Sequence, residues 1–169
     1  TLGGTGKTPL VEWLVRWFRA RGVAVAIVSR GYKSAAGAPN DEALELAGKL
    51  PDTPHVQNPR RAVAAEQAIR DYGAKLIVLD DAFQHRRIHR DLDIVLLDAL
   101  EPFGYERVFP RGMLREPVSG LRRAGAVVLS RSDAVSQQQR VAIRARARRL
   151  APQALWVESA QRPGGLLSA

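Results

Sequence analysis

The stretch Gly3-Gly4-Thr5-Gly6-Lys7-Thr8 decides the fold class, because it joins closely spaced glycines to a lysine and a hydroxyl residue. Glycines let the backbone curl so that successive N–H groups point at phosphate oxygens. A helix that begins at about Lys7 adds the positive end of its dipole. Lys7 is then placed to reach the β- and γ-phosphates of a nucleotide, and the Thr8 hydroxyl to bind Mg²⁺. The stretch predicts a phosphate-binding loop, although Thr1 stands where the usual spacing has a glycine.

Strand and helix patterns alternate along the rest of the chain. Helices are predicted over Thr8–Arg21, Asp41–Leu50, the segment that follows Pro59 and runs to about Tyr72, and residues 136–150. Strands are predicted over Val23–Ser29, Leu76–Leu79, Asp93–Leu97, Ala126–Leu129 and Ala154–Val157, with a loop at 31–40. This alternation predicts an α/β fold, a P-loop NTPase-like parallel sheet with helices on both faces. No domain boundary is visible, so we expect residues 1–169 to form one nucleotide-binding domain.

The beginning of the chain carries a further expectation. A phosphate-binding loop normally follows a buried strand, and here the loop comes directly after Thr1 and Leu2. We therefore expect the chain to be truncated upstream of its first loop.

Composition narrows the class of protein. The chain has 169 residues, of which 46% are hydrophobic, and it has no cysteine, so disulfides and thiolate metal sites are excluded. Its formal net charge of +9 favours anionic partners, either a nucleotide, a phospholipid surface or nucleic acid. Arginines that are merely solvated explain the same charge equally well. Stacking aromatics and a base-reading helix are missing from the pattern, so no nucleic acid is expected.

The second chemical motif is an acidic strand end. A hydrophobic run over Leu76–Leu79 is followed by Asp80 and Asp81. In a parallel sheet, residues at the carboxyl end of a strand lie beside the ligand. Carboxylate oxygens at that position suit Mg²⁺ that bridges nucleotide phosphates. An Asp pair alone often caps a turn, but its combination with the phosphate-binding loop favours a metal site.

Other candidates keep two interpretations each. His85 could support catalysis or be an ordinary turn histidine. Asp41 and Glu42 stand at a loop-to-helix junction, where one of them could accept a proton or simply stabilise the helix start, and the residues alone favour the second role. Several loop arginines, which could grip an anionic substrate or be solvated, cluster along the chain: Arg60, Arg61, Arg111, Arg115, Arg122 and Arg123.

Five stretches together resemble the tetraacyldisaccharide 4'-kinase family, which phosphorylates the lipid A disaccharide precursor. They are GGTGKTP (3–9), VSRGY (28–32), NDEALELA (40–47), LDDAFQHRRIHRDLDIVLLDA (79–99) and FPRGMLREPVSGLRRAGAVVLSR (109–131). They run in the family's order and cover most of the chain to about residue 133. The combination of DD-x-x-Q-H with the later G-x-L-R-E-P is specific to that family.

The resemblance implies a role for each candidate residue. Lys7 and Thr8 would hold ATP and Mg²⁺, Asp80 and Asp81 would serve the metal, and His85 would support catalysis. Asp41 falls where the family places its catalytic base, with Glu42 beside it. Arg60 or Arg61, whose register stays open, and Arg115 would serve the substrate.

The resemblance also implies partners and a place in the cell. They are the lipid A disaccharide precursor and an anionic membrane surface, at the cytoplasmic face of the bacterial inner membrane. The family's N-terminal membrane helix and C-terminal lobe have no counterpart in the 169 residues, and Asn40 and Ala82 stand where glycines are common.

Two other functions compete with this interpretation. A nucleotide-switch ATPase of the partition or cofactor-insertion type, which binds DNA or a protein partner, would share the phosphate-binding loop. A kinase for a small molecule would share the chemistry. The G-x-L-R-E-P and DDAFQH stretches favour the lipid sugar over both.

Overall fold

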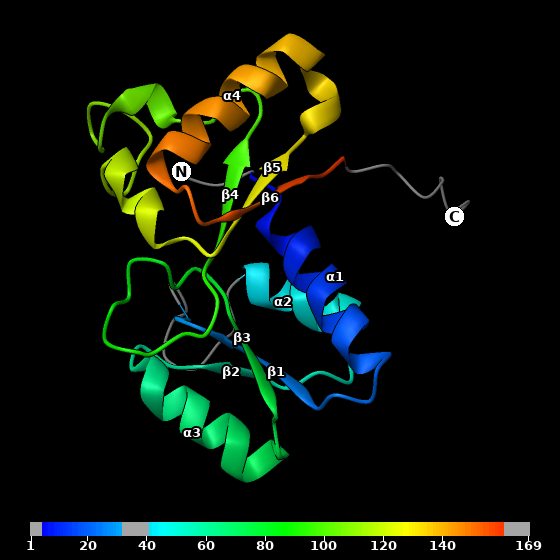
Figure 1. Ribbon diagram of the computed structural model, residues 1–169. Helices are drawn as coiled ribbons and strands as arrows, with labels where there is room; N and C mark the ends of the chain where they lie inside the picture. Colours follow the sequence, from blue (N-terminus) through cyan, green and yellow to red (C-terminus); the bar gives the residue numbers. More distant parts are fainter. Residues whose placement is uncertain (1–4, 32–40, 161–169) are drawn as a thin grey trace. The chain divides into compact units, whose positions relative to one another are not determined.

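The computed structural model describes residues 5–31 and 41–160, and for residues 41–43 the backbone alone (Figure 1). The chain divides into two compact units, which are described separately. The first unit is Lys7–His89. The second unit consists of the described residues of Thr1–Gly6 and Arg90–Ala169.

The first unit is a three-stranded parallel sheet with helices on both faces. Its elements follow in the order α1 (Lys7–Arg19), β1 (Val25–Ser29), α2 (Asp41–Lys49), β2 (His55–Gln57), α3 (Arg61–Tyr72) and β3 (Leu76–Leu79). The strand order is β2-β1-β3, so the fully buried β1 is central. All pairs are parallel, which brings the carboxyl ends of the three strands to one edge of the sheet.

The alternation of side chains along β1 divides the core of the first unit into two clusters. Val25 and Ile27 pack with residues of α1 and α2, including Val15 and Leu46. Ala26 and Val28 point the other way. They pack with small residues on and after α3, and Figure 1 shows α3 on the opposite side of this sheet from α1 and α2: Ala64, Ala68 and Ala74.

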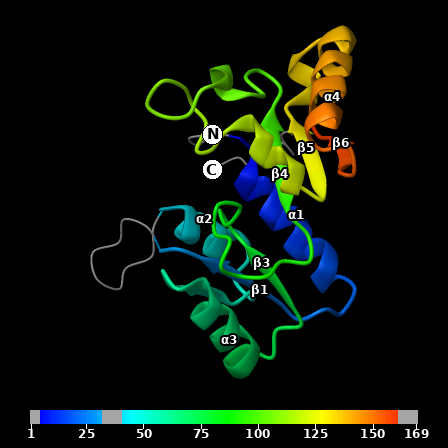
Figure 2. The ribbon, with the colours of Figure 1, turned by 60° about the vertical axis from the view of Figure 1, so that its left-hand side comes forward.

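The second unit contains another three-stranded parallel sheet. Its strands are β4 (Ile94–Asp98), β5 (Ala126–Ser130) and β6 (Leu155–Glu158), in that order across the sheet. Three short 3₁₀ helices, η1 (Gly104–Glu106), η2 (Val118–Arg123) and η3 (Ser132–Ala134), lie in its connections. Helix α4 (Gln137–Leu150) follows β5 in sequence and lies along β5 and β6 (Figure 2).

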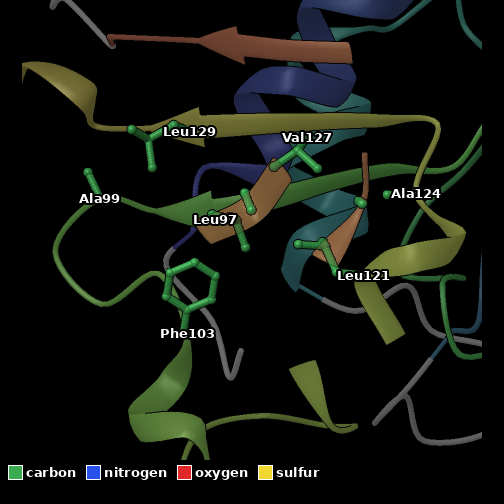
Figure 3. Close-up of a cluster of buried hydrophobic side chains, with 9 residues drawn as sticks. Leu97, Ala99, Phe103, Leu121, Ala124, Val127 and Leu129 are labelled. Carbon is green, nitrogen blue, oxygen red and sulfur yellow. The ribbon is translucent and has the colours of Figure 1, made fainter. Parts of the chain in front are cut away.

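One hydrophobic cluster holds the second unit together. Leu97 of β4 and Val127 and Leu129 of β5 meet Phe103 and Leu121 from the loops that follow β4 (Figure 3). Ala147 and Ala151 add the contribution of α4 and of the residue after it. The helix begins with a reciprocal cap between Ser136 and Gln139.

The alternation of strands and helices is confirmed as parallel sheets with flanking helices, distributed over two sheets of three strands. The predicted helices and strands are present, and their observed bounds differ from the predicted ones by at most two residues. Strand β2 was missed, because three residues are too few to establish a periodicity. Within the described part of the chain, no helix combines the length and the apolar composition that crossing a bilayer requires.

Candidate phosphate-binding site

Lys7 and Asp81 meet at the carboxyl edge of the first unit's sheet. Lys7 is the first residue of α1, and its Nζ lies 3.5 Å from Oδ1 of Asp81. Asp81 follows β3 by two residues and adopts a left-handed backbone with φ of 52°. This conformation is uncommon outside glycine and is concentrated at functional sites. The turn after β3 thus directs a carboxylate to the start of the helix that carries the lysine.

Asp80 and Arg61 belong to the same neighbourhood. The backbone N–H of Asp80 donates to the carbonyl of Val28 at 2.9 Å, which extends the pairing of β3 with β1. Arg61, the first residue of α3, has only 4% of its surface exposed. Burial lowers the pKa of the Arg61 guanidinium, and the charge of Arg30 lowers it further, whereas Asp81 and Asp80 act in the opposite direction. A buried guanidinium therefore lies within electrostatic reach of both carboxylates.

The structure distinguishes the two adjacent arginines. Arg60 is exposed and precedes α3, with its backbone N–H donating to Asn58 Oδ1 at 2.8 Å. Arg61 turns inward, and its Nη1 donates to the carbonyl of Asn58 at 3.3 Å. Among the described residues, Nε of Arg61 has no hydrogen-bond partner. A buried donor without a partner is costly unless an acceptor is supplied, so Arg61 is the better candidate for binding an anion.

We predict that Arg61→Ala lowers kcat/KM for phosphoryl transfer about 10- to 100-fold, the loss expected for one or two charge-assisted hydrogen bonds. Arg60→Ala is the matched control and is expected to change kcat/KM by less than about twofold, because its side chain is exposed. Arg61→Lys keeps the charge but lacks the planar fork of the guanidinium. Its kcat/KM should therefore fall between those of Arg61→Ala and Arg60→Ala. A larger loss in Arg60→Ala than in Arg61→Ala would reverse the assignment.

His55 and Ser29 form a contact that sequence analysis missed. Nε2 of His55, in β2, lies 2.8 Å from Oγ of Ser29 at the end of β1. Burial lowers the pKa of His55 because it removes the water that would solvate the imidazolium. Among the described residues, Nδ1 of His55 has no partner. The two residues are 26 positions apart, so only the pairing of β1 with β2 reveals the contact.

The lowered pKa of His55 predicts a pH dependence of stability. Below the ordinary value of 6.5, the unfolded chain binds a proton that the folded chain does not bind. The free energy of unfolding should therefore fall as the pH drops through about 6.5, by at most about 1.4 kcal/mol per pH unit. We expect urea denaturation between pH 7.5 and 5.5 to show a weaker pH dependence in His55→Gln than in wild type. His89→Gln is the control, and equal slopes in wild type and His55→Gln would contradict the prediction.

Other candidates of the first unit are placed only in part. The half-buried His85 lies in the turn after Asp81, where its backbone N–H donates to the carbonyl of Ala82 at 2.8 Å. Asp41 is the first residue of α2, but the side chains of Asp41 and Glu42 lie outside the described part of the chain. The roles of these three residues stay predictions.

The second unit holds the described part of the glycine loop. Gly3 and Gly4 lie outside the described residues, Thr5 is buried and Gly6 has φ of 82°. A Cβ on Gly6 would lie 3.6 Å from Cβ of Ser130, at the end of β5. The positive φ therefore explains the requirement for glycine at this position better than lack of space does.

An ion pair links the carboxyl ends of β4 and β5 in the second unit. Asp98, the last residue of β4, accepts hydrogen bonds from Arg131, including one from Nε at 3.0 Å. Arg131 follows β5 and has a left-handed backbone with φ of 54°. Sequence analysis singled out neither residue, because they are 33 positions apart and only the register of β4 with β5 brings them together.

The G-x-L-R-E-P stretch combines a tight turn with an ion pair. A Cβ on Gly112 would lie 2.3 Å from the carbonyl oxygen of Arg107, so no other residue fits without a backbone shift. Glu116 is bound by Arg123 at 2.8 Å. Arg115, predicted to serve the substrate, is exposed in the second unit. The stretch is thus partly a structural motif, and the role of Arg115 stays a prediction.

The metal ligands predicted from the sequence are hard oxygen donors. Among the described residues, no three Asp, Glu or His side chains gather into a group that could bind a metal ion by themselves. Mg²⁺ commonly takes only one or two protein carboxylates and completes its shell with water and phosphate oxygens. The Asp81 carboxylate beside Lys7, with Asp80 adjacent to it in sequence, fits a metal that is bound together with a nucleotide.

Comparison with known proteins gives the family. The sequence profile of the tetraacyldisaccharide-1-P 4'-kinase family matches residues 1–164. This chain is a member of that family. It is 43% identical over 148 residues to the tetraacyldisaccharide 4'-kinase of Syntrophotalea carbinolica, an alignment that covers 78% of the chain and 42% of that relative. It is 44% identical over 182 residues to the enzyme of the same name from Anaeromyxobacter dehalogenans, with 98% and 48% covered.

Two further facts define the extent of these likenesses. The family member described here spans about half the length of these relatives. The structure resembles that of the hydrogenase maturation factor HypB from Archaeoglobus fulgidus with a TM-score of 0.60, over 93% of this chain and 76% of that one. The sequence identity to HypB is 12%, so this likeness concerns the fold alone.

Proposed function

We propose that the protein transfers the γ-phosphoryl group of ATP to the 4'-hydroxyl of a tetraacyldisaccharide 1-phosphate, a step in the synthesis of lipid A. Membership of the family supports the reaction, since the relatives carry that name. The 3.5 Å contact of Lys7 with Asp81 is the structural observation on which the proposal rests. It supports the proposal because it brings the lysine that would bind phosphate and a carboxylate that would bind the metal together at the start of one helix.

Each residue has a physical task in this reaction. Gly3, Gly4, Thr5 and Gly6 would donate backbone N–H groups to the phosphates, and Lys7 would balance their negative charge. Mg²⁺, bound through Thr8, Asp80 and Asp81, would neutralise charge that develops during the transfer. We propose that Arg61 and Arg115 bind the anionic acceptor, with Arg60 as the weaker alternative. The two units would belong to one nucleotide-binding domain.

The acceptor hydroxyl needs a base. We propose that Asp41 takes its proton, supported by Glu42, and that His85 assists. Asp41 begins α2, and the start of a helix favours a negatively charged carboxylate there. An ionised carboxylate is the form that accepts a proton.

The decisive experiment follows ³²P from ATP to a tetraacyldisaccharide 1-phosphate in mixed detergent micelles, with the full-length protein. Labelled lipid that requires both the acceptor and Mg²⁺ is the expected result. The same samples are assayed for release of inorganic phosphate without lipid. Tight ATP binding with hydrolysis but no labelled lipid would overturn the proposal in favour of a nucleotide-switch ATPase.

The membrane partner follows from the substrate, since a tetraacylated sugar resides in a bilayer. We propose that the full-length enzyme works at the cytoplasmic face of the bacterial inner membrane. The net charge of +9 supports contact with anionic headgroups.

A further inference from the structure

We propose that the outer face of α1 and of the turn that follows it, formed by Trp13, Trp17 and Arg21, docks the protein on an anionic lipid bilayer. This face is called the tryptophan face below. The inference rests on the proposed function for its purpose, because a lipid kinase must reach a substrate held in a membrane. Its physical basis is separate and consists of exposed indoles, their anchoring and their charged surroundings.

Two large aromatic side chains lie uncovered on one side of α1. Trp13 is 57% exposed and Trp17 is 39% exposed. They stand four residues apart, so they lie on the same side of the helix, and their ring centroids are 6.4 Å apart. An indole that is exposed to water gains no free energy from burial. At a membrane interface, by contrast, the ring enters the apolar layer and the N–H stays in contact with polar groups.

The packing of α1 on the core of the first unit holds these two indoles on the outer side of the helix. Val11 and Val15 of α1 are buried against β1 and α2. Phe18 packs on the same cluster and meets Trp17 edge to face, with centroids 4.8 Å apart. Trp17 is therefore held in place from the inside, and Trp13 extends one turn closer to the start of the helix. A rigid aromatic pair loses little conformational entropy on docking.

The charges around the indoles favour anionic headgroups. The Arg21 guanidinium lies 3.5 Å from the ring centroid of Trp17, and its Nη1 donates to the Trp17 carbonyl at 2.9 Å. The only acidic residue of α1 is Glu12, which is bound by Arg16 at 3.0 Å and lies 3.8 Å from Lys49. Each basic residue near an anionic bilayer strengthens binding to it. Indoles for the interface and cations for the headgroups thus lie side by side.

Helix α4 is the other surface that could dock on an anionic bilayer. It has the cations but lacks the exposed aromatic side chains. It is rich in arginine, but its sequence contains no aromatic residue, and Val141 is its one large exposed apolar side chain. Arg140 and Arg146 already contact Glu158 and Glu106. Electrostatic attraction without apolar contact gives weak, reversible membrane binding, so we assign the docking to α1.

The position of the tryptophan face suits the reaction. Trp13 is six residues after Lys7, which corresponds to about 9 Å along the axis of an α-helix. A bilayer in contact with Trp13 would thus be within about one disaccharide's length of the phosphate-binding end of the same helix. The face would bring the headgroup region of the membrane close to the phosphate-binding end of α1.

The test uses the tryptophans as reporters. The chain has three, so the Trp156→Phe variant keeps only Trp13 and Trp17. It is mixed with vesicles of phosphatidylcholine containing 40 mol% phosphatidylglycerol or none. We expect the emission to shift to shorter wavelength with the anionic vesicles only, together with co-sedimentation of the protein. Emission that is already short without vesicles would mean that protein covers the face, and would overturn the proposal.

Matched variants locate the surface. Trp13→Ser should weaken partitioning to anionic vesicles about tenfold or more, from the apolar area lost. Tyr72→Ser, which removes a comparably exposed aromatic from α3 (53%), should leave it unchanged. Arg21→Gln should weaken partitioning about fivefold at low salt, and the double variant Arg148→Gln/Arg149→Gln of α4 should not exceed that loss. A larger loss in the α4 variant, or equal losses in Trp13→Ser and Tyr72→Ser, would overturn the proposal.

Docking and catalysis can fail separately. In detergent micelles, where no bilayer has to be reached, Trp13→Ser should phosphorylate the lipid acceptor at the wild-type rate. Transfer in micelles without vesicle binding by wild type would refute the docking surface and leave the proposed function intact. Vesicle binding through Trp13 without phosphoryl transfer in micelles would refute the proposed function and leave the docking surface intact.

Discussion

Lys7→Ala is expected to lower kcat for phosphoryl transfer about 10³-fold or more, because the lysine supplies charge where negative charge develops in the transition state. Its Nζ lies 3.5 Å from Asp81, and the two side chains are 25% and 40% exposed. A pair this exposed contributes about 1 kcal/mol or less to stability. The loss should therefore appear in the rate and not in the fold, as transfer of ³²P and a thermal melt will measure together.

Lys75→Ala is the matched control for Lys7→Ala, because Lys75 is exposed and lies beside β3 in the same unit. It should transfer phosphate at the wild-type rate. Lys7→Arg keeps the charge but replaces a compact ammonium by a planar fork, so it should recover only part of the activity. A Lys7→Ala protein that keeps more than a tenth of wild-type kcat would rule out this lysine as the cation on the transferred phosphate.

Asp41→Asn is expected to lower kcat about 10²- to 10⁴-fold, the usual contribution of a positioned general base. The amide has nearly the same shape as the carboxylate but cannot accept the proton of the acceptor hydroxyl. Asp41 begins α2, and this helix is fixed by Leu46, which is 1% exposed in the core of the first unit. The loss should therefore affect kcat more than the KM for the lipid, as initial rates in mixed micelles will show.

The control for Asp41→Asn lies on the same helix. Glu45 is one turn further along α2, half exposed, and contacts Lys49 at 2.6 Å. Glu45→Gln should change kcat by less than about twofold, because an exposed pair of this kind contributes little. If Asp41→Asn lost thermal stability but kept its rate, Asp41 would be a helix-stabilising residue alone. That was the interpretation which the residues by themselves favoured.

Local patterns in the sequence predicted the parts of the site that lie on single elements. The glycines before Lys7 indicate a phosphate-binding loop wherever a helix follows, and the apolar run before Asp80 indicates a buried strand with acidic residues at its end. The contact between Lys7 and Asp81 spans 74 positions. It was expected because the carboxyl ends of parallel strands share one edge of a sheet.

The remaining features depend on contacts between distant segments. Arg60 and Arg61 are identical side chains in sequence, and only the start of α3 at Arg61 turns one outward and the other inward. The contact of His55 with Ser29 and that of Asp98 with Arg131 require the register of paired strands. No residue pattern in the sequence predicts the left-handed backbone of Asp81, because aspartate adopts this conformation only occasionally.

The alanines between α3 and β1 have a consequence for how the protein can change over evolutionary time. Ala26, Ala64 and Ala68 are all fully buried, so the helix approaches the strand closely, and even one added methyl group there forces the two apart. On the other side of β1, Val25 and Ile27 meet side chains of varied size that can exchange volume with one another. We expect homologous sequences to vary more on the α1 side, within a constant total volume, than on the α3 side. Because α3 begins at Arg61, we expect a larger residue at one of these alanines to move Arg61 relative to the two aspartates.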